Sequence, residues 1–363
     1  MNDKTIESIL KENRSFSPTQ NFVKEANLKE SDFQDLRKKA EDNYEEYWAD
    51  LARHNIYWFK DFTKTLDSSN APNYEWFSDG ELNVSYNCLD VHASVMPNKK
   101  AIIFESEDGR NQIFTYKELL EEVSAFSNGL LKLGIQAMDR VIIYMPMVPE
   151  AIIAMQACAR IGAVHSVVFG GFSANALRDR INDAGAKIVI TADGAYRGGK
   201  IIPLKESTDI ALEQDCQSIE HVVVLKRTNK SIMMHDERDI WWDSLIEGEN
   251  RHCDAVSLPS EHPLFILYTS GSTGKPKGIQ HSSGGYILHA KLTNQWVFDL
   301  KDNDIFWCTA DVGWITGHSY VAYGPLAAGA TIMIYEGAPT YPHGGRFWEI
   351  CQKHKVTIFY TAP

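Results

Sequence analysis

Residues 263–281 read Pro263-Leu-Phe-Ile-Leu-Tyr-Thr-Ser-Gly-Ser-Thr-Gly-Lys-Pro-Lys-Gly-Ile-Gln-His281, an apolar run that leads into a loop of glycines, hydroxyls and lysines. The unbroken bulky residues Leu264 to Tyr268 are typical of a strand buried on both faces. In the loop, glycines let backbone N–H groups approach an anion, and the hydroxyls and lysines add donors and positive charge. The sequence therefore predicts a phosphate-binding loop that consists of Thr269, Ser270, Gly271, Ser272, Thr273, Gly274, Lys275, Lys277 and Gly278.

The main alternative for this loop is the P-loop, G-x-x-x-x-G-K-[ST], which continues directly into a helix. Here Pro276 follows Lys275, so the hydroxyl that would help to hold Mg²⁺ is missing, and a helix is not expected to run through this point. A P-loop-like ATPase or kinase is therefore a second interpretation, which the proline disfavours.

Strand and helix patterns alternate along most of the chain. Apolar runs predict strands at 101–104, 141–145, 164–169, 187–192, 221–225, 264–268, 305–309, 331–335 and 356–360. Helical patterns separate them at 115–133, 149–161, 174–184, 204–213, 286–296, 320–328 and 345–354, and Thr115 with Glu118 has the spacing of a capping box. This alternation predicts repeated βαβ units, and hence an α/β fold with mainly parallel sheets and helices packed on both faces.

Three regions are expected along the chain. Residues 1–95 begin with charged helical patterns and continue into an aromatic, Asn- and Asp-rich segment, which predicts an N-terminal extension wrapped on the main body. Residues 96–260 form a first α/β subdomain, and residues 261–363 begin a second one that carries the loop. Because the sequence stops directly after an apolar strand, at Tyr360-Thr-Ala-Pro363, we expect the chain to be part of a longer protein.

Composition excludes several classes of protein. A formal net charge of -12 argues against a nucleic-acid-binding surface, which needs a basic face. The N-terminus has no apolar signal-peptide core, and charged residues and prolines interrupt the longest apolar stretch, so neither a signal peptide nor a membrane span is expected. The 6 cysteines are widely spaced without a C-x-x-C pair, which indicates reduced thiols and a cytoplasmic protein. The sequence gives no indication of the oligomeric state.

Three further loops follow predicted strands. Gly170 and Gly171 stand between a strand and a helix, where a ligand can approach the backbone. The segment 191–203 places Arg197 and Lys200 three residues apart, as a pair suited to phosphates. In the segment 311–325, the triplet Trp314-Ile-Thr316 could form a small pocket wall.

Two other interpretations of these stretches are rejected. The segment Gly317-His-Ser-Tyr-Val321 is similar to the hydrolase elbow G-x-S-x-G, but Val321 occupies the position of the final glycine, so Ser319 is not expected to be a nucleophile. The histidines show no metal-ligand spacing with cysteines or carboxylates, so no metal site is predicted within the chain.

The loop Tyr268-Thr-Ser-Gly-Ser-Thr-Gly-Lys-Pro-Lys-Gly278 resembles the signature loop of the adenylate-forming enzymes. Further motifs resemble the AMP-forming acetyl-CoA synthetases within that superfamily, over the chain from about residue 20 to its end. They are Trp76-Phe-Ser-Asp-Gly-Glu-Leu-Asn83, Asn87-Cys-Leu-Asp90, Phe169-Gly-Gly-Phe172, Ile190-Thr-Ala-Asp193, Ala310-Asp-Val-Gly-Trp-Ile-Thr-Gly-His-Ser-Tyr320 and Tyr335-Glu-Gly337.

The resemblance implies a two-step ligase that uses ATP, Mg²⁺ and coenzyme A (CoA). Acetate attacks the α-phosphate of ATP to form acetyl-adenylate and pyrophosphate, and the thiol of CoA then displaces AMP. The loop would hold the β- and γ-phosphates, with Mg²⁺ sharing their charge. CoA would contact Gly170, Gly171, Arg197, Gly198, Gly199, Lys200 and Thr316, and acetate would bind near Trp314, Ile315 and Thr316.

The sequence departs from the family pattern at two positions. Lys200 stands where the family usually has Arg, which replaces a bidentate contact with a point charge. Thr340 stands where Asn is common. The family's adenine-binding motifs, its ribose-binding Asp and its catalytic Lys are expected beyond Pro363, so we expect this chain alone to be inactive in both half-reactions.

Three alternatives remain open at this stage. They are a synthetase for propionate or another short acid, the P-loop-like ATPase or kinase described above, and a non-catalytic module that binds CoA through Arg197 and Lys200.

Overall fold

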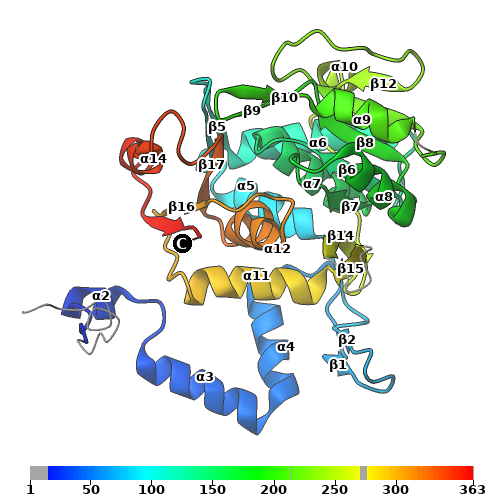
Figure 1. Cartoon of the computed structure of the whole chain (residues 1–363). Helices are drawn as coiled ribbons and strands as arrows, with labels where there is room; N and C mark the ends of the chain where they lie inside the picture. Colours follow the sequence, from blue (N-terminus) through cyan, green and yellow to red (C-terminus); the bar gives the residue numbers. More distant parts are fainter. Residues whose placement is uncertain (1–14, 214, 270–275, 363) are drawn as a thin grey trace, which may run out of the picture.

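The computed structural model describes residues 15–213, 215–269 and 276–362, and its main body is built on two large sheets (Figure 1). The larger sheet has seven strands in the order β12-β11-β8-β6-β7-β14-β15. Neighbouring strands in it are parallel, except that β14 and β15 are antiparallel. The strands are β6 (Arg140–Tyr144), β7 (Val164–Val167), β8 (Ile188–Ala192), β11 (His221–Leu225), β12 (Asp239–Trp241), β14 (Pro263–Thr269) and β15 (Lys277–Ser282).

The second sheet has five strands in the order β18-β16-β17-β4-β5, in which β5 alone pairs in the antiparallel direction. Its strands are β4 (Lys100–Ser106), β5 (Asn111–Thr115), β16 (Ile305–Cys308), β17 (Thr331–Glu336) and β18 (Ile358–Tyr360). The prediction of an α/β fold with mainly parallel sheets is confirmed.

Helices cover both faces of the seven-stranded sheet. The chain moves in one direction across the sheet from β6 to β7 and in the other from β7 to β8 and β11, so right-handed crossovers place α7 on one face and α8 and α9 on the other. In agreement, α7 packs with α6, and α8 packs with α9. The helices are α6 (Tyr116–Lys132), α7 (Pro149–Ile161), α8 (Ala174–Ala184), α9 (Leu204–Leu212) and α10 (Trp242–Ile246).

The predicted capping box at the start of α6 is confirmed. The backbone N–H of Glu118 donates to Oγ1 of Thr115 at 3.2 Å, and the backbone N–H of Thr115 donates to Oε2 of Glu118 at 2.8 Å. These two bonds satisfy N–H groups that a helix start leaves without an internal partner.

A helical layer lies between the two sheets, and one helix closes the outer face. Helices α11 and α13 pack together with the π-helical turns η1 and η2, and α13 also contacts β17. On the other face of the five-stranded sheet, α14 covers a separate apolar cluster that includes Trp307, Tyr335 and Ile350. The bounds are η1 (Tyr86–Asp90), α5 (Val91–Val95), α11 (Gly284–Trp296), α12 (Ile315–Gly317), η2 (His318–Tyr323), α13 (Gly324–Ala327) and α14 (Arg346–His354).

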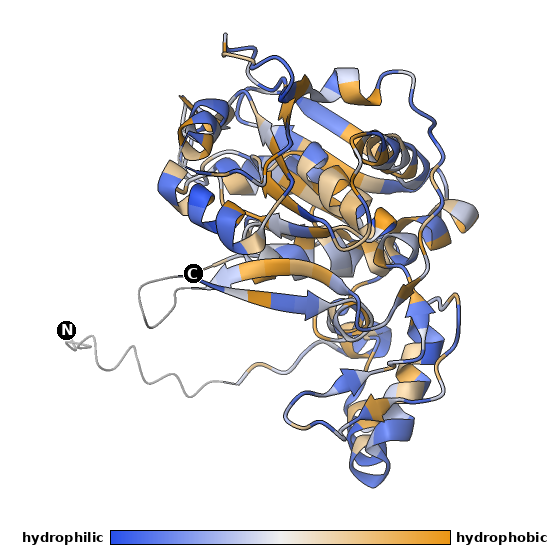
Figure 2. Ribbon diagram, turned by 90° about the vertical axis from the view of Figure 1, so that its right-hand side faces the viewer, coloured by the Kyte–Doolittle hydropathy of each residue, from blue (hydrophilic) through white to orange (hydrophobic). Residues whose placement is uncertain are grey.

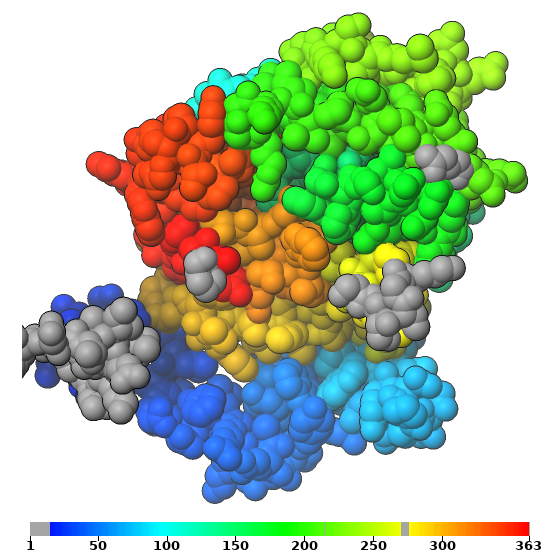
Figure 3. Space-filling model, viewed as in Figure 1, coloured from blue at the N-terminus to red at the C-terminus, as the bar shows by residue number. Residues whose placement is uncertain are grey.

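The N-terminal segment lies beneath α11 (Figures 1 and 3). Helix α4 contacts α11, and the Asn27 backbone N–H donates to Asp299 Oδ1 at 2.7 Å. Figure 2 shows apolar residues concentrated in the body and mainly hydrophilic ones on the N-terminal helices. Further elements are α2 (Gln20–Glu25), α3 (Glu30–Asp42), α4 (Tyr44–Asn55), β1 (Leu66–Asp67), β2 (Glu75–Trp76), β3 (Glu81–Leu82) and β13 (Leu258–Pro259).

Both large sheets contain strands from before and after residue 260, where the sequence predicts a subdomain boundary. That boundary stays a prediction. Strand β14 follows that boundary but joins the sheet of β6 to β8, whereas β4 precedes it but joins the sheet of β16 to β18. Pairing between strands far apart in sequence is decided by tertiary packing, so the order of the segments along the chain does not reveal it.

The structure also differs from the sequence prediction at several elements. Strand β14 is buried at Leu264, Phe265 and Leu267, but Ile266 and Tyr268 are half-exposed, so the strand is not buried on both faces as expected. The helix expected at 320–328 begins earlier and has a π-helical middle, because α12, η2 and α13 follow one another without a break from Ile315 to Ala327. Strands β5 and β15 were not predicted, since polar residues dominate both.

Candidate functional site

The segment 195–202, expected to be a loop, forms a β-hairpin of strands β9 (Ala195–Arg197) and β10 (Lys200–Ile202). Gly198 and Gly199 make its two-residue turn with φ angles of 62° and 71°, the left-handed values that a tight hairpin turn requires and that glycine adopts without strain. Arg197 and Lys200 are cross-strand partners, so both side chains leave the same face of the hairpin. The hairpin therefore brings together two cations that the sequence places three residues apart.

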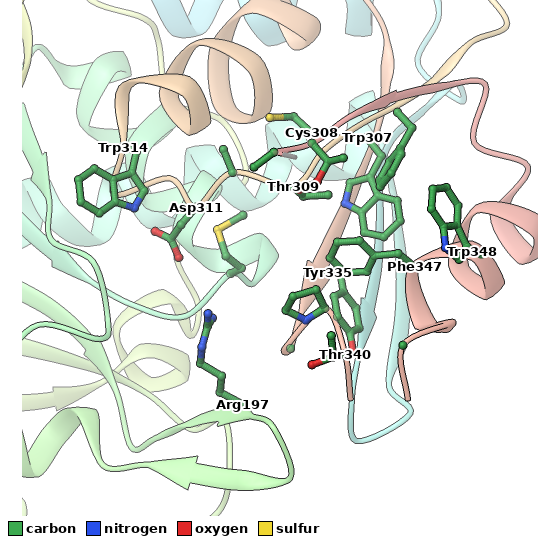
Figure 4. A pocket seen from close by; sticks show the side chains of 18 of the residues that line it. Arg197, Trp307, Cys308, Thr309, Asp311, Trp314, Tyr335, Thr340, Phe347 and Trp348 are labelled. Carbon is green, nitrogen blue, oxygen red and sulfur yellow. Dashed lines mark hydrogen bonds between the residues drawn. The ribbon is translucent and has the colours of Figure 1, made fainter. Parts of the chain in front are cut away.

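A cavity of about 630 Å³ opens beside the hairpin (Figure 4). Arg197 points into it, Asp311 and Trp314 lie on one side, and aromatic residues from β16, β17 and α14 lie on the other. Its volume is in the range of sites for cofactors and other extended small molecules. The lining residues include Met147, Phe169, Trp307, Cys308, Thr309, Tyr335, Gly337, Pro339, Thr340, Phe347, Trp348 and Phe359.

The cations of the hairpin have no ionic partner within the described part of the chain: no carboxylate there forms an ion pair with Arg197 or Lys200. The Arg197 guanidinium instead lies 5.9 Å from the centre of the Phe169 ring, in a cation–π contact. A guanidinium that is directed into a cavity and forms no ion pair there is suited to a ligand that carries phosphate or carboxylate groups.

Asp311 gives this cavity a half-buried carboxylate. Its Oδ1 accepts a hydrogen bond from the Gly313 backbone N–H at 2.7 Å. Burial raises the pKa of Asp311 to about 6, although the Gly313 N–H and the charge of Arg197 both favour the ionised form. Asp311 lies in the motif 310–320, but the residue pattern predicts no role for it, because its surroundings come from tertiary packing.

The predicted glycines Gly170 and Gly171 follow β7 and line a small annex of about 90 Å³ that shares Arg197 and Asp311 with the main cavity. A side chain at Gly171 would meet the Phe169 ring at 2.4 Å, so packing alone explains that glycine. At Gly170 the closest atom would be the Met145 carbonyl oxygen at 3.5 Å, an ordinary contact. Gly170 is therefore the position of the pair at which a ligand can approach the backbone.

The three residues predicted to line an acetate pocket do not share one cavity. Trp314 lines the cavity beside the hairpin, in ring contact with Phe169 and Phe172. Ile315 faces a second cavity of about 580 Å³ between the N-terminal segment and α11, together with Tyr286 and Ser319. Thr316 is half-buried and lines neither of these two cavities. The two cavities are approached from consecutive residues, because Trp314 has extended backbone and Ile315 begins α12.

The predicted phosphate loop connects two antiparallel strands. Thr269 at the end of β14 pairs with Lys277 at the start of β15, and Tyr268 pairs with Gly278. Ser270, Gly271, Ser272, Thr273, Gly274 and Lys275 lie outside the described residues. A P-loop is followed by a helix, whereas this loop is followed by a strand, which agrees with the disfavoured P-loop interpretation.

Ser319 lacks the surroundings of a nucleophile. Its Oγ lies 3.1 Å from the Tyr286 hydroxyl, and no imidazole forms a hydrogen bond with it among the described residues. The neighbouring His318 is fully buried, and burial lowers its pKa to about 3. A base of that pKa would not activate a hydroxyl at neutral pH, which supports the rejection of a hydrolase elbow.

One group of side chains has metal-ligand spacing in the described ranges: Asp209, His235 and Asp239. Lys205 already lies 2.7 Å from Asp209 and 2.8 Å from Asp239, and Arg238 also pairs with both carboxylates. Because two cations neutralise these carboxylates, the group does not fit a divalent metal.

Comparison with known proteins gives the family. Residues 89–363 match the family described as "AMP-binding enzyme", and residues 33–88 match "Acetyl-coenzyme A synthetase N-terminus". Similar proteins include the acetyl-coenzyme A synthetases of Laribacter hongkongensis, 60% identical over 361 residues, and of Chromobacterium violaceum, 57% identical over 361 residues. These alignments cover 99% of this chain and 55% of each relative, so the chain spans about half the length of the curated relatives it matches. The chain belongs to the AMP-binding enzyme family.

Proposed function

We propose that this chain carries the CoA site of an acetyl-CoA synthetase, a ligase that converts ATP, acetate and CoA into acetyl-CoA, AMP and diphosphate. The observation that carries this proposal is Arg197, a cation without an ionic partner in the described chain, which points into a cavity large enough for CoA. Relatives that are 57–60% identical and bear this name support it.

The proposed reaction has two steps. In the first, an acetate oxygen attacks the α-phosphorus of ATP, the bond to the β-phosphate oxygen breaks, and pyrophosphate leaves. In the second, the CoA sulfur attacks the acetyl carbon, the carbon–oxygen bond to AMP breaks, and the thiol proton is released. Acetate is already ionised at neutral pH, so the first step needs charge neutralisation and alignment more than a general base.

CoA carries its phosphates at one end and its thiol at the other, and the cavity offers matching surroundings for both. Arg197 and Lys200 would neutralise the phosphates at the hairpin. Trp314, which is 47% exposed, offers an apolar wall to the uncharged arm that ends in the thiol. Gly170 would let that arm pass close to the backbone.

The loop from Thr269 to Gly278 would hold the β- and γ-phosphates of ATP through its backbone N–H groups and lysines. Mg²⁺ would arrive with the nucleotide and reduce the charge of the phosphates. In the described residues, the one group with metal-ligand spacing is neutralised by Lys205 and Arg238, so we assign no resident metal ligands.

The acid is proposed to be acetate, with propionate or another short acid as the alternative. Ile315 is branched and bulky, and it would limit the length of an acyl group. Because it lines the second cavity, with Tyr286 and Ser319, the acyl group would bind on that side of α12.

The test is a pyrophosphate-release assay with ATP, Mg²⁺ and a series of acids from acetate to butyrate, with and without CoA. We would run it on a chain of the relatives' full length and on the 363-residue chain. Release that depends on the acid and is fastest with acetate would support the proposal. We expect the 363-residue chain alone to give no release, and release by it would contradict the expected inactivity.

Two other outcomes would select the alternatives. Phosphate release that does not depend on the acid would identify an ATPase or kinase. CoA binding without any pyrophosphate release by the longer chain would identify a binding module.

A cytoplasmic location is also proposed. All 6 cysteines are free thiols in the structure, as is usual for proteins of a reducing compartment. No helix in the described ranges is both long and apolar enough to cross a membrane.

A further inference from the structure

The tip of the hairpin is held by a carboxylate from the other sheet. Glu107 lies just after β4, and its Oε1 accepts hydrogen bonds from the backbone N–H groups of Gly198 at 2.5 Å and Ala338 at 3.3 Å. Its Oε2 accepts a bond from the Gly199 N–H at 3.0 Å. One side chain therefore joins the turn of the hairpin to the loop after β17, on two sides of the same cavity.

These contacts change the role that the sequence suggested for the two glycines. A backbone N–H has one proton to donate, and both glycine protons already point at Glu107. Binding of a phosphate by these amides would first require the carboxylate to leave. In the hairpin, the side chains of Arg197 and Lys200 are therefore the groups that would bind an anion.

Contacts around Glu107 and the hairpin hold the Glu107 carboxylate in place. Its own backbone N–H donates to the Glu336 carbonyl at 3.0 Å, which continues the pairing of β4 with β17. The Tyr341 ring lies against Gly199, where an added Cβ would be 2.8 Å from it. At the base of the hairpin, Glu336 Oε1 accepts a bond from the Tyr196 N–H at 3.2 Å. The hairpin is consequently fixed at its base and its tip by two carboxylates of the five-stranded sheet.

We propose that Glu107 is a positioning residue for CoA binding: it fixes the Gly198–Gly199 turn and thereby directs Arg197 into the cavity. The inference rests on the proposed function, because it concerns the same CoA site. Glu107 acts through Arg197 and the hairpin backbone, and it does not contact the ligand itself.

A competing interpretation makes the opposite prediction. If Glu107 were an internal substitute for a ligand phosphate, it would compete with CoA, and removing it would free three N–H groups and strengthen binding. A positioning residue does the reverse, because a turn without its carboxylate leaves Arg197 free to move away from the cavity.

The experiment measures CoA binding to the 363-residue chain by titration calorimetry, with Glu107→Gln as the main variant. An amide keeps one acceptor oxygen and replaces the other with NH₂, which cannot accept the remaining N–H bond. We expect about tenfold weaker binding in Glu107→Gln, a larger loss in Glu107→Ala and partial recovery in Glu107→Asp. Tighter binding in Glu107→Ala, or unchanged binding in Glu107→Gln, would overturn the proposal.

The matched control is Asp79→Asn. Asp79 also accepts backbone bonds, from the N–H groups of Thr63 at 2.9 Å and Lys64 at 3.1 Å, but it lies in the N-terminal segment. This variant removes a carboxylate that holds a turn without touching the cavity, so its CoA affinity should match that of the unchanged chain. Equal losses in both variants would show that the effect of Glu107 is only structural.

A double-mutant cycle tests whether Glu107 acts through Arg197. Once Arg197→Ala has removed the guanidinium, adding Glu107→Gln should weaken binding less than twofold further. A second full tenfold loss would overturn the positioning role. Failure of the proposed function is distinguishable, because then the unchanged chain would not bind CoA and Arg197→Ala would have no effect.

Discussion

Arg227 and Glu336 form a buried ion pair that joins the two sheets, with 2.9 Å between Nε of Arg227 and Oε2 of Glu336. Arg227 follows β11 of the seven-stranded sheet, and Glu336 ends β17 of the five-stranded sheet. Their side chains are 4% and 2% exposed. The pKa of Glu336 is raised, since its loss of hydration outweighs the attraction of Arg227. The pair lies at the base of the hairpin that carries Arg197, so the contact between the sheets and the geometry of the site depend on the same residues.

The first prediction concerns this ion pair. Glu336→Ala leaves Asp108 as the remaining carboxylate paired with the buried Arg227 guanidinium, and it removes the acceptor of the Ser106 hydroxyl and the Tyr196 N–H, so we expect a loss of about 3 kcal/mol in the free energy of unfolding. Urea denaturation followed by circular dichroism measures it. Glu41→Ala is the control, because Glu41 pairs with Arg37 while both side chains are 64% exposed, and its loss should stay below about 0.5 kcal/mol. Similar losses in the two variants would contradict the role of burial.

The second prediction concerns Arg197. Arg197→Ala should weaken CoA binding about 30-fold, because a charge-assisted contact with phosphate is lost, and Arg197→Lys should weaken it less. Titration calorimetry at several salt concentrations is the measurement, and the affinity of the unchanged chain should fall as salt rises. Arg37→Ala, in the N-terminal segment, should bind CoA like the unchanged chain. Equal affinity of Arg197→Ala and the unchanged chain would remove this residue from the site.

The third prediction concerns Lys200, which stands beside Arg197 on the same face of the hairpin. Lys200→Arg supplies a planar fork that can bind phosphate through two bonds, so CoA affinity should rise a few-fold. The same titration measures it, with Lys200→Gln expected to bind more weakly than the unchanged chain. If all three bind CoA alike, Lys200 makes no contact with the ligand.

The fourth prediction separates the cost of left-handed backbone from the cost of a steric contact at Gly199 in the hairpin turn, with Gly109 in the turn between β4 and β5 as the reference. Gly109 has a φ of 88° and no atom within 4 Å of an added Cβ, so Gly109→Ala measures the cost of the left-handed backbone, about 1 kcal/mol. Gly199 has a φ of 71° and also faces the Tyr341 ring. Gly199→Ala should therefore lose about 2 kcal/mol in the same unfolding experiment. Equal losses would show that the ring moves aside without cost.

The fifth prediction concerns the pH dependence that comes from Asp311. Because its folded-state pKa is raised to about 6, the folded protein binds more protons than the unfolded chain between about pH 4 and pH 6. Asp311 therefore lowers stability as pH rises through this range, by up to about 3 kcal/mol. Asp311→Asn should remove that part of the slope in unfolding experiments at pH 4.5 and pH 7. Identical slopes in the two proteins would contradict the raised pKa.

The sequence alone determined the fold class and most of the elements. Helix α8 and strand β11 have the predicted bounds, because each combines a clear apolar period with local end signals such as Ser173 before α8 and Gly185 after it. Pro276 predicted that no helix continues from the loop after β14, and strand β15 follows it, whereas the phosphate-binding role of the loop stays a prediction. Local chemistry was sufficient in each of these cases.

Only the tertiary structure decided which strands share a sheet and which predicted residues share a cavity. The hairpin that joins Arg197 to Lys200 leaves no periodic signal in three-residue strands, and Glu107 reaches its tip from 91 positions away in the chain. Trp314 and Ile315 are adjacent in sequence, yet they line different cavities, because Trp314 has extended backbone before α12 whereas Ile315 is the first residue of that helix. Local residue patterns specify local backbone, whereas the site depends on contacts between distant segments, which form only when the two sheets pack together.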